Sequence, residues 1–338
     1  MKKLFQNGLL FFFSIAVAIL LAEAVCRIIP LSNDSDPTYK LAHEVLPFVM
    51  KPNSESISIH GHVLKINSHG LRDFEYSYEK EKGVFRILVL GDSVTFAFGN
   101  DMEAGYSKVL ERQLNEIVEK KYSKVEVINA AHNGYNTFDE YNYLRLYGLK
   151  YSPDLLVVGV TYADFTTQSM NIIIKDGVDS RPGSFWLNIP TWVKKTLRQS
   201  HLYIAIGWVR ANRGFSIKDP TAHPVPSENN ETLIKTKDNF DKITALASKE
   251  KIPLYFISIP GRGEVLLKSY LHPQFIQHLR TLENEGKGYF IDSLDGFTSH
   301  SDRLDDLYAL KDSSHPSAEG HQILGNYLFK RISPIVSK

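Results

Sequence analysis

The chain has 338 residues, of which 43% are hydrophobic and 23% charged, and its formal net charge is +1. This composition is typical of a globular protein with one large or two ordinary domains. It argues against a nucleic-acid-binding protein, which normally has a strong basic excess. The single cysteine, Cys26, excludes an intramolecular disulfide framework and a zinc site built from cysteines.

Residues 1–29 have the pattern of a membrane-targeting element. Two lysines at the start precede an apolar stretch that continues to Ile29, which is long enough to cross a bilayer as a helix with its N-terminus inside. We favour an uncleaved anchor. Small residues at positions 22 and 24 also suit signal peptidase, so removal of the segment before Val25 is the alternative. Both outcomes place the rest of the chain outside the cytoplasm, in the periplasm or at the cell exterior.

Residues 30–83 are poor in helix-forming patterns. Turn-forming residues at 33–37 are followed by isolated aliphatic residues between 57 and 66, which predict short strands. We interpret this region as an extended arm that links the membrane segment to the domain and packs on it.

From residue 84 onward, predicted strands alternate with predicted helices. The strands are expected at 84–90, 125–129, 153–160, 253–259 and 289–291. Helices are expected at 106–121, 138–149 and 318–332, and a further helix is expected to end at residue 249. This alternation predicts βαβ units and a parallel five-stranded sheet with helices on both faces. The segment 261–264, just after the fourth strand, is expected to be a plain turn.

Residues 166–231 interrupt the alternation, and we interpret them as a partly helical insertion after the third strand. All three tryptophans of the chain lie in it: Trp186, Trp192 and Trp208. We expect its aromatic side chains to pack against the domain. Alternatively, these side chains line a substrate groove or contact the bilayer.

A serine follows the first predicted strand directly, in the sequence Gly91-Asp92-Ser93. Open α/β sheets bind their ligands at this end of the strands. A serine hydroxyl needs a neighbouring base to become a nucleophile. Asp312 and His315, three residues apart before the last helix, could form a turn that holds a carboxylate beside an imidazole, as in serine-hydrolase triads. The alternative is that Asp312 or Ser313 caps the helix and His315 is a polar surface residue.

Together, Gly91-Asp92-Ser93 and Asp312-x-x-His315-Pro316 resemble the SGNH/GDSL hydrolase superfamily. Two further blocks, at 129–137 and 159–165, resemble the family's intervening motifs, and the similarity covers about residues 85–332 without the insertion. The resemblance implies a three-layer α/β/α flavodoxin-like fold, here with an N-terminal membrane helix, and a reaction that needs no metal or organic cofactor. The implied domain spans 84–338.

The resemblance also implies roles for individual residues. Ser93 would be the nucleophile, His315 the base and Asp312 the residue that orients His315. The N–H groups of Ser93 and Gly134 would stabilise the oxyanion.

One position departs from the family pattern. Ala163 stands where the family has an oxyanion-hole asparagine, and losing such a donor costs on the order of 3 kcal/mol of transition-state stabilisation. Thr161, Asn136 or a side chain from the insertion could compensate.

These features predict a membrane-tethered, extracytoplasmic serine esterase that hydrolyses O-acyl esters through an acyl-enzyme. Its partners would be the membrane and an acylated carbohydrate or other ester, with acetyl groups of a cell-surface polysaccharide as one candidate, and no nucleic acid. Two alternatives stay open. One is an O-acetyltransferase of the same fold, and the other, suggested by Ala163, is a catalytically inactive binding or scaffolding protein.

Overall fold

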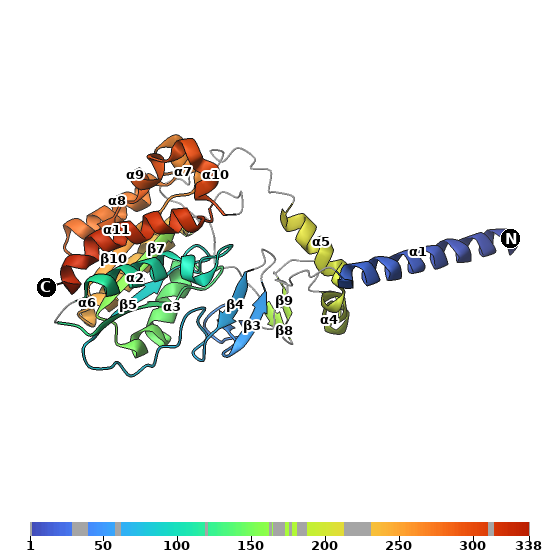
Figure 1. The fold of residues 1–338 in the computed structure, drawn as a ribbon, viewed down its shortest axis with the longest axis horizontal. Helices are drawn as coiled ribbons and strands as arrows, with labels where there is room; N and C mark the ends of the chain where they lie inside the picture. Colours follow the sequence, from blue (N-terminus) through green and yellow to red (C-terminus); the bar gives the residue numbers. More distant parts are fainter. Residues whose placement is uncertain are drawn as a thin grey trace.

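A computed structural model shows how these segments are arranged (Figure 1). It describes residues 2–28, 40–57, 62–118, 121–161, 164, 173–175, 178–180, 188–212, 231–309 and 314–337. Asp312 and Ala163 lie outside these ranges, as do Trp186 and large parts of the proposed insertion.

The centre of the molecule is a five-stranded sheet in which every strand pairing is parallel. Its strands are β5 (Val84–Leu90), β6 (Lys124–Asn129), β7 (Leu155–Thr161), β10 (Leu254–Ile259) and β11 (Tyr289–Ile291). They lie in the order β6-β5-β7-β10-β11, which is the 2-1-3-4-5 order of flavodoxin-like proteins. The predicted fold class is therefore confirmed, and the five strands lie within two residues of their expected bounds.

Side chains of each strand alternate between two apolar layers, as the period of two in a β-strand requires. Leu88 and Leu90 of β5 face one layer, and Ile87 and Val89 face the other. Both layers are buried because helices cover them, which explains why the strands are apolar throughout. The covering helices are α3 (Thr137–Leu146), α6 (Glu231–Lys249) and α8 (Pro273–Asn284) on the first face, and α2 (Tyr106–Ile117) and α11 (Ala318–Val336) on the second.

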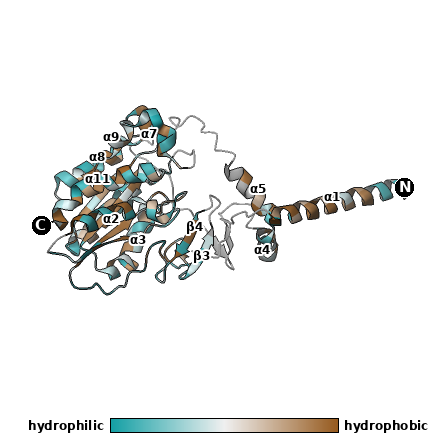
Figure 2. Cartoon of the chain, viewed as in Figure 1, coloured by the Kyte–Doolittle hydropathy of each residue, from teal (hydrophilic) through white to brown (hydrophobic). Residues whose placement is uncertain are grey.

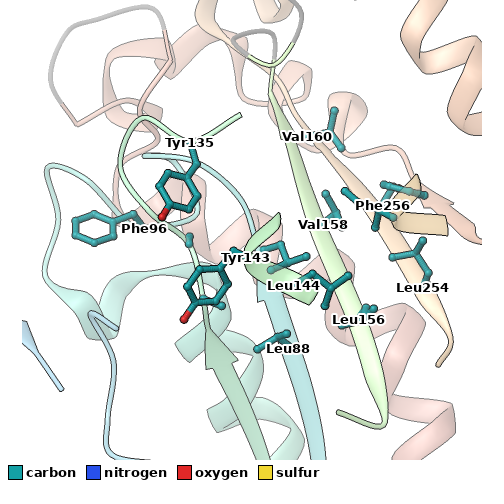
Figure 3. Packing of buried hydrophobic residues seen from close by; sticks show 14 of the residues in the cluster. Leu88, Phe96, Tyr135, Tyr143, Leu144, Leu156, Val158, Val160, Leu254 and Phe256 are labelled. Carbon is teal, nitrogen blue, oxygen red and sulfur yellow. The ribbon is translucent and has the colours of Figure 1, made fainter. Parts of the chain in front are cut away.

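Figure 3 shows the first of these layers from close by. Tyr143 and Leu144 of α3 lie against Leu88 of β5 and Leu156 of β7 in one buried cluster. The helix α3 itself begins with a capping box, in which Asn136 and Asp139 accept hydrogen bonds from each other's backbone.

The segment after β10 differs from the expected plain turn. It begins a short helix, α7 (Arg262–Leu267), because the carboxylate of Glu264 accepts hydrogen bonds from Gly261 N (2.9 Å) and Leu271 N (3.0 Å). Sequence analysis also had no prediction for α8, although Pro273 opens it and its apolar residues have helical spacing. Short helices α9 (Leu294–Thr298) and α10 (Leu304–Leu307) then lead to α11.

The arm before β5 contains two short antiparallel pairs and then packs into the domain. The pairs are β1 (Lys40–Leu41) with β2 (Val49–Met50), and β3 (Ser54–Ile57) with β4 (Val63–Ile66). Arg72, Asp73 and Tyr76 follow and are all buried. Asp73 forms an ion pair with Lys108 of α2, with an Oδ1–Nζ distance of 2.7 Å. The arm is thus part of the folded core.

The N-terminal segment forms one long helix, α1 (Lys2–Ile28), which extends away from the α/β body (Figure 1). It is apolar along most of its length (Figure 2), and by length and composition Gln6–Ile28 could cross a membrane. Beside its C-terminal end lie α4 (Thr191–Gln199) and α5 (His201–Asn212), the helices described in the insertion. The insertion also contributes the antiparallel pair β8 (Ile173–Lys175) and β9 (Val178–Ser180).

The expected packing of the aromatic residues of the insertion against the domain is wrong for Trp192 of α4, since 71% of its surface is exposed. The side chains of Trp186 and Trp208 lie outside the part of the chain that the structure describes.

Candidate active site

Ser93 lies just beyond the carboxyl end of β5, at the point where the strand order of the sheet reverses. The turn that carries it is compact. A Cβ atom on Gly91 would come within 2.1 Å of Thr95 Oγ1, and one on Gly159 of β7 within 2.5 Å of the same atom. Glycine at both positions therefore makes room for the hydroxyl of Thr95, which hydrogen-bonds to Tyr106 (2.9 Å).

His315 is hydrogen-bonded to Ser93, with an Nε2–Oγ distance of 2.9 Å. For the serine hydroxyl to donate, the ring must carry its proton on Nδ1. The ring of Phe98 lies 5.2 Å from the imidazole between centroids, so an apolar side chain flanks the pair. The two residues are 222 positions apart in the chain, and the fold brings them into contact.

Three hydrogen bonds to backbone carbonyl oxygens hold the segment around His315. Ala309 N donates to His315 O (2.9 Å), and Ser317 N donates to Leu307 O (2.7 Å). The side-chain amide of Asn100 donates to Pro316 O (2.9 Å). Because Asn100 follows the turn that carries Ser93, this last bond ties the segment of His315 to the segment of Ser93.

The loop after β6 reaches the turn that carries Ser93 through a backbone hydrogen bond from His132 N to Gly91 O (3.2 Å). This loop contains Gly134, which has a φ of 89°, in the left-handed region that favours glycine. Within the described ranges, the N–H groups of Ser93 and Gly134 have no acceptor at hydrogen-bond distance. Both backbone donors are thus available for a ligand oxygen.

Of the two residues expected to compensate for Ala163, Thr161 has its hydroxyl bonded to another side chain, whereas the bonds of Asn136 occupy its side-chain oxygen and not its amide donors. The hydroxyl of Thr161 donates to Asp92 Oδ2 (2.9 Å). The side-chain oxygen of Asn136 accepts from Phe138 N (3.0 Å) and Asp139 N (3.1 Å) at the start of α3. Thr161 would have to give up its bond to Asp92 in order to donate to an oxyanion.

A sequence model described as the GDSL-like Lipase/Acylhydrolase family matches residues 89–323, which is more than half of the chain. The chain belongs to this family. It is therefore an ester-hydrolysing enzyme, and the match includes Ser93 at one end and His315 near the other. A search of curated proteins found no match.

Solved structures with similar folds include several esterases, each with low sequence identity. A putative lipolytic protein of the G-D-S-L family from Desulfitobacterium hafniense DCB-2 is 15% identical, with a TM-score of 0.45, over 72% of this chain and 98% of that one. The acetyl xylan esterase AlAXEase is also 15% identical, with a TM-score of 0.47, over 73% of this chain and 100% of that one. TesA is 15% identical, with a TM-score of 0.44, over 74% and 99%.

Three buried carboxyl groups lie beneath the catalytic end of this GDSL-like hydrolase: Asp92, Asp164 and Glu140. Burial raises the pKa of Asp92. Burial also raises the pKa of Glu140 well above its ordinary value, and the charges of Asp164 and Asp92 raise it further. The charge of His315 opposes this rise in the pKa of Asp92, because an imidazolium nearby favours an ionised carboxyl.

The second histidine of the last segment has a different environment. His321 is buried against Tyr106, whose backbone N–H donates to its Nδ1 (3.4 Å), and burial lowers the pKa of His321 to about 3. It stays neutral at physiological pH and has a packing role.

Arg72, which holds the loop after Ser93, was not predicted from the sequence. Its guanidinium is buried and donates to the carbonyl oxygens of Phe96 (3.0 Å), Ala97 (3.0 Å) and Asn100 (2.8 Å). Ala97 has a φ of 60°, a conformation that is costly for alanine and needs support from its surroundings. Arg72 supplies this support and fixes the position of Phe98 and Asn100, which contact the His315 segment.

We expect Arg72→Lys to lower kcat about ten- to a hundredfold while KM changes little, because one ammonium cannot reproduce the planar fork that binds several carbonyls and small misplacements slow catalysis strongly. Steady-state kinetics on an ester substrate measures this. Arg112→Lys is the matched control, since the exposed Arg112 binds a single carbonyl, Glu103 O (2.7 Å). Equal kcat values for the two variants would contradict a positioning role for Arg72.

Proposed function

We propose that this enzyme is a membrane-tethered serine esterase that removes O-acyl groups from carbohydrate at the outer face of the membrane. The observation that carries the catalytic part is the hydrogen bond between Ser93 Oγ and His315 Nε2. A serine with a histidine at 2.9 Å, at the reversal point of a parallel sheet, has the geometry of an activated nucleophile.

In the proposed mechanism, Ser93 attacks the ester carbonyl while His315 Nε2 takes the proton from its hydroxyl. Asp312 would accept the hydrogen bond from Nδ1 and hold the ring in this tautomer. The N–H groups of Ser93 and Gly134 would stabilise the negative charge that develops on the carbonyl oxygen. His315 then returns the proton to the leaving alcohol, and water attacks the acyl-enzyme with His315 again acting as the base.

The substrate proposal rests on where the domain is held. The apolar helix α1 would keep it at the membrane, with the two N-terminal lysines on the inner side and the α/β domain on the outer side. A domain tethered there would reach polymers that stay at the cell surface, and O-acetylated polysaccharides are polymers of this kind that carry ester groups.

Acetyl release from polysaccharide tests this function. Full-length protein in detergent should release acetate from p-nitrophenyl acetate and from an O-acetylated oligosaccharide, and a fluorophosphonate should label Ser93. If an unacetylated oligosaccharide gains acetyl groups faster than acetate appears in solution, the protein is a transferase of the same fold. If the fluorophosphonate does not react, the serine is not activated and the protein is a binding or scaffolding member of the family.

A further inference from the structure

We propose that α4 and α5 lie in the interface of the bilayer that α1 crosses, so that the insertion seats the hydrolase domain on the lipid surface. The partner is the headgroup and upper acyl region of the membrane at the C-terminal end of α1. This inference rests on the anchoring role proposed for α1, and it concerns a different part of the chain from the catalytic residues.

A carboxylate of α1 binds the N-terminus of α5. Glu23 accepts hydrogen bonds from His201 N (3.1 Å), Leu202 N (2.9 Å) and Ser200 Oγ (2.7 Å). Its other contacts are Arg27 of its own helix, with an Nε–Oε1 distance of 3.0 Å, and the ring of His201, with an Nδ1–Oε1 distance of 3.7 Å. An acidic residue near the end of an apolar helix is costly unless it finds donors, and here every donor outside α1 belongs to the start of α5.

The cap of α5 is complete only with α1 present. Ser200 Oγ accepts from Tyr203 N (3.2 Å), as an ordinary N-cap serine does, and Ile204 N donates to Ser200 O (3.1 Å). The two earlier N–H groups, on His201 and Leu202, are the ones that Glu23 binds. A negative charge at this end of a helix also interacts favourably with its dipole. The two helices are therefore joined by a specific contact.

The surface that these helices expose is suited to lipid. Trp192 of α4 is 71% exposed, and Ile206 and Val209 of α5 are 54% and 40% exposed. Ile206 and Val209 are three residues apart and so share one face of α5. Residues 191–212 contain four lysine or arginine residues, of which Lys194 is buried, and no aspartate or glutamate. Tryptophan, aliphatic residues and cations without acids are characteristic of helices that lie in a membrane interface.

The contact with α1 indicates that a bilayer covers the exposed surface of α4 and α5. Glu23 lies five residues before the end of the segment that could span the membrane, Gln6–Ile28. Whatever Glu23 contacts must lie near the depth at which that segment leaves the hydrocarbon. The start of α5 is therefore held at the interface, and the exposed side chains of α4 and α5 lie next to it.

This arrangement has a consequence for processing of the chain. Cleavage before Val25, the alternative considered from the sequence, would remove Glu23 and leave two N–H groups of α5 without their acceptor. We infer that α1 is retained in the mature protein. The intact mass of the membrane-extracted protein should include residues 2–24, and a chain that starts at Val25 would overturn the inference.

Tryptophan quenching in vesicles tests the position of α4. The full-length variant with Trp186→Phe and Trp208→Phe keeps Trp192 as its one tryptophan. It is reconstituted in phosphatidylcholine–phosphatidylglycerol vesicles whose acyl chains carry bromine either near the carbonyl end or near the methyl end. We expect strong quenching by the shallow bromines and weak quenching by the deep ones. Equal fluorescence with brominated and plain lipid would overturn the proposal.

Two further measurements separate the interfacial position of α4 and α5 from the proposed anchoring by α1 and from the proposed esterase activity. Vesicle flotation and p-nitrophenyl acetate hydrolysis on the same samples report on anchoring and on the proposed esterase activity. Flotation with activity but without quenching would refute only the interfacial position of α4 and α5.

The Glu23 contact has its own test. In the Trp192 variant, Glu23→Ala should increase hydrogen exchange at His201 and Leu202 about fivefold, as expected for loss of a cap, and should weaken quenching by the shallow bromines. Arg27→Gln is the matched control, because it removes the partner of Glu23 that is not on α5. Unchanged exchange in Glu23→Ala, or equal effects of the two variants, would overturn the proposed coupling.

Discussion

Replacing Ser93 by alanine is expected to lower kcat on p-nitrophenyl acetate by about 10⁴-fold or more, because the acyl-enzyme can no longer form and only binding and backbone donors remain. His315→Ala should have an effect of similar size, since the two residues act as a unit. The double variant should therefore be little worse than either single one. Burst kinetics and steady-state rates on purified full-length protein measure this.

The surface of the protein offers a matched control for these two variants. Ser299 and His300 are also hydrogen-bonded, with an Oγ–Nδ1 distance of 3.1 Å, but they lie on the second face of the sheet at the end of α9. Ser299→Ala and His300→Ala should keep the wild-type rate. If Ser93→Ala also keeps it, Ser93 is not the nucleophile, and the proposed mechanism is wrong.

Replacing Lys108 by methionine is expected to lower the free energy of unfolding by about 3–5 kcal/mol, because it leaves buried carboxylates without their cation. The ammonium lies 2.7 Å from Asp73 Oδ1 and 2.7 Å from Glu111 Oε2, and it donates to the hydroxyl of Tyr76 (2.9 Å). Denaturant unfolding measures the change. Lys124→Met is the control: the half-exposed Lys124 lies 3.3 Å from Glu126, and a surface pair of this kind is worth about 1 kcal/mol or less.

The sign of the pH dependence sharpens this prediction. Burial raises the pKa of Asp73 to about 6, and the charge of Lys108 opposes the rise. A carboxyl whose pKa is higher in the folded state holds its proton more tightly there, so its contribution to stability falls as the pH rises from the unfolded value to the folded one. Without Lys108, the pKa of Asp73 in the folded state rises further, and the loss of stability with rising pH continues to higher pH. The variant should therefore be more destabilised at about pH 8 than at about pH 5. Equal destabilisation at both pH values would contradict a buried, charge-dependent role for Lys108.

Much of the fold could be predicted because its signals are local. Each central strand is a short run of β-branched and aliphatic residues, and the predicted strand 84–90 coincides with β5 (Val84–Leu90). The helices α2, α3, α6 and α11 follow from their period in the same way, whereas α7 and α8 were not predicted. The insertion was less predictable, because α4 and α5 are short. The pattern of apolar residues in such a helix is the same whether the helix packs on a protein core or on a membrane.

Part of the candidate site was also visible from spacing. Ser93 at a strand end and His315 before the last helix are local features, and the structure brings them within 2.9 Å. The role of Arg72 was not visible, because the carbonyl groups that it binds in the loop after Ser93 are backbone groups 24 to 28 residues away and no side-chain pattern encodes them. Nor does any local signal show that the Thr161 hydroxyl binds Asp92, 69 residues earlier in the chain.

The sequence by itself therefore determined the order of strands and helices, the position of the serine at a strand end and the apolar character of α1, since these follow from residue periodicity and local turn chemistry. Only the tertiary structure decided which distant groups meet: Ser93 with His315, Arg72 with the loop after Ser93, and Glu23 with the start of α5. Such contacts depend on how the sheet and its connections close in space. A hydrogen bond between residues as far apart as Glu23 and His201 leaves no periodic trace along the chain.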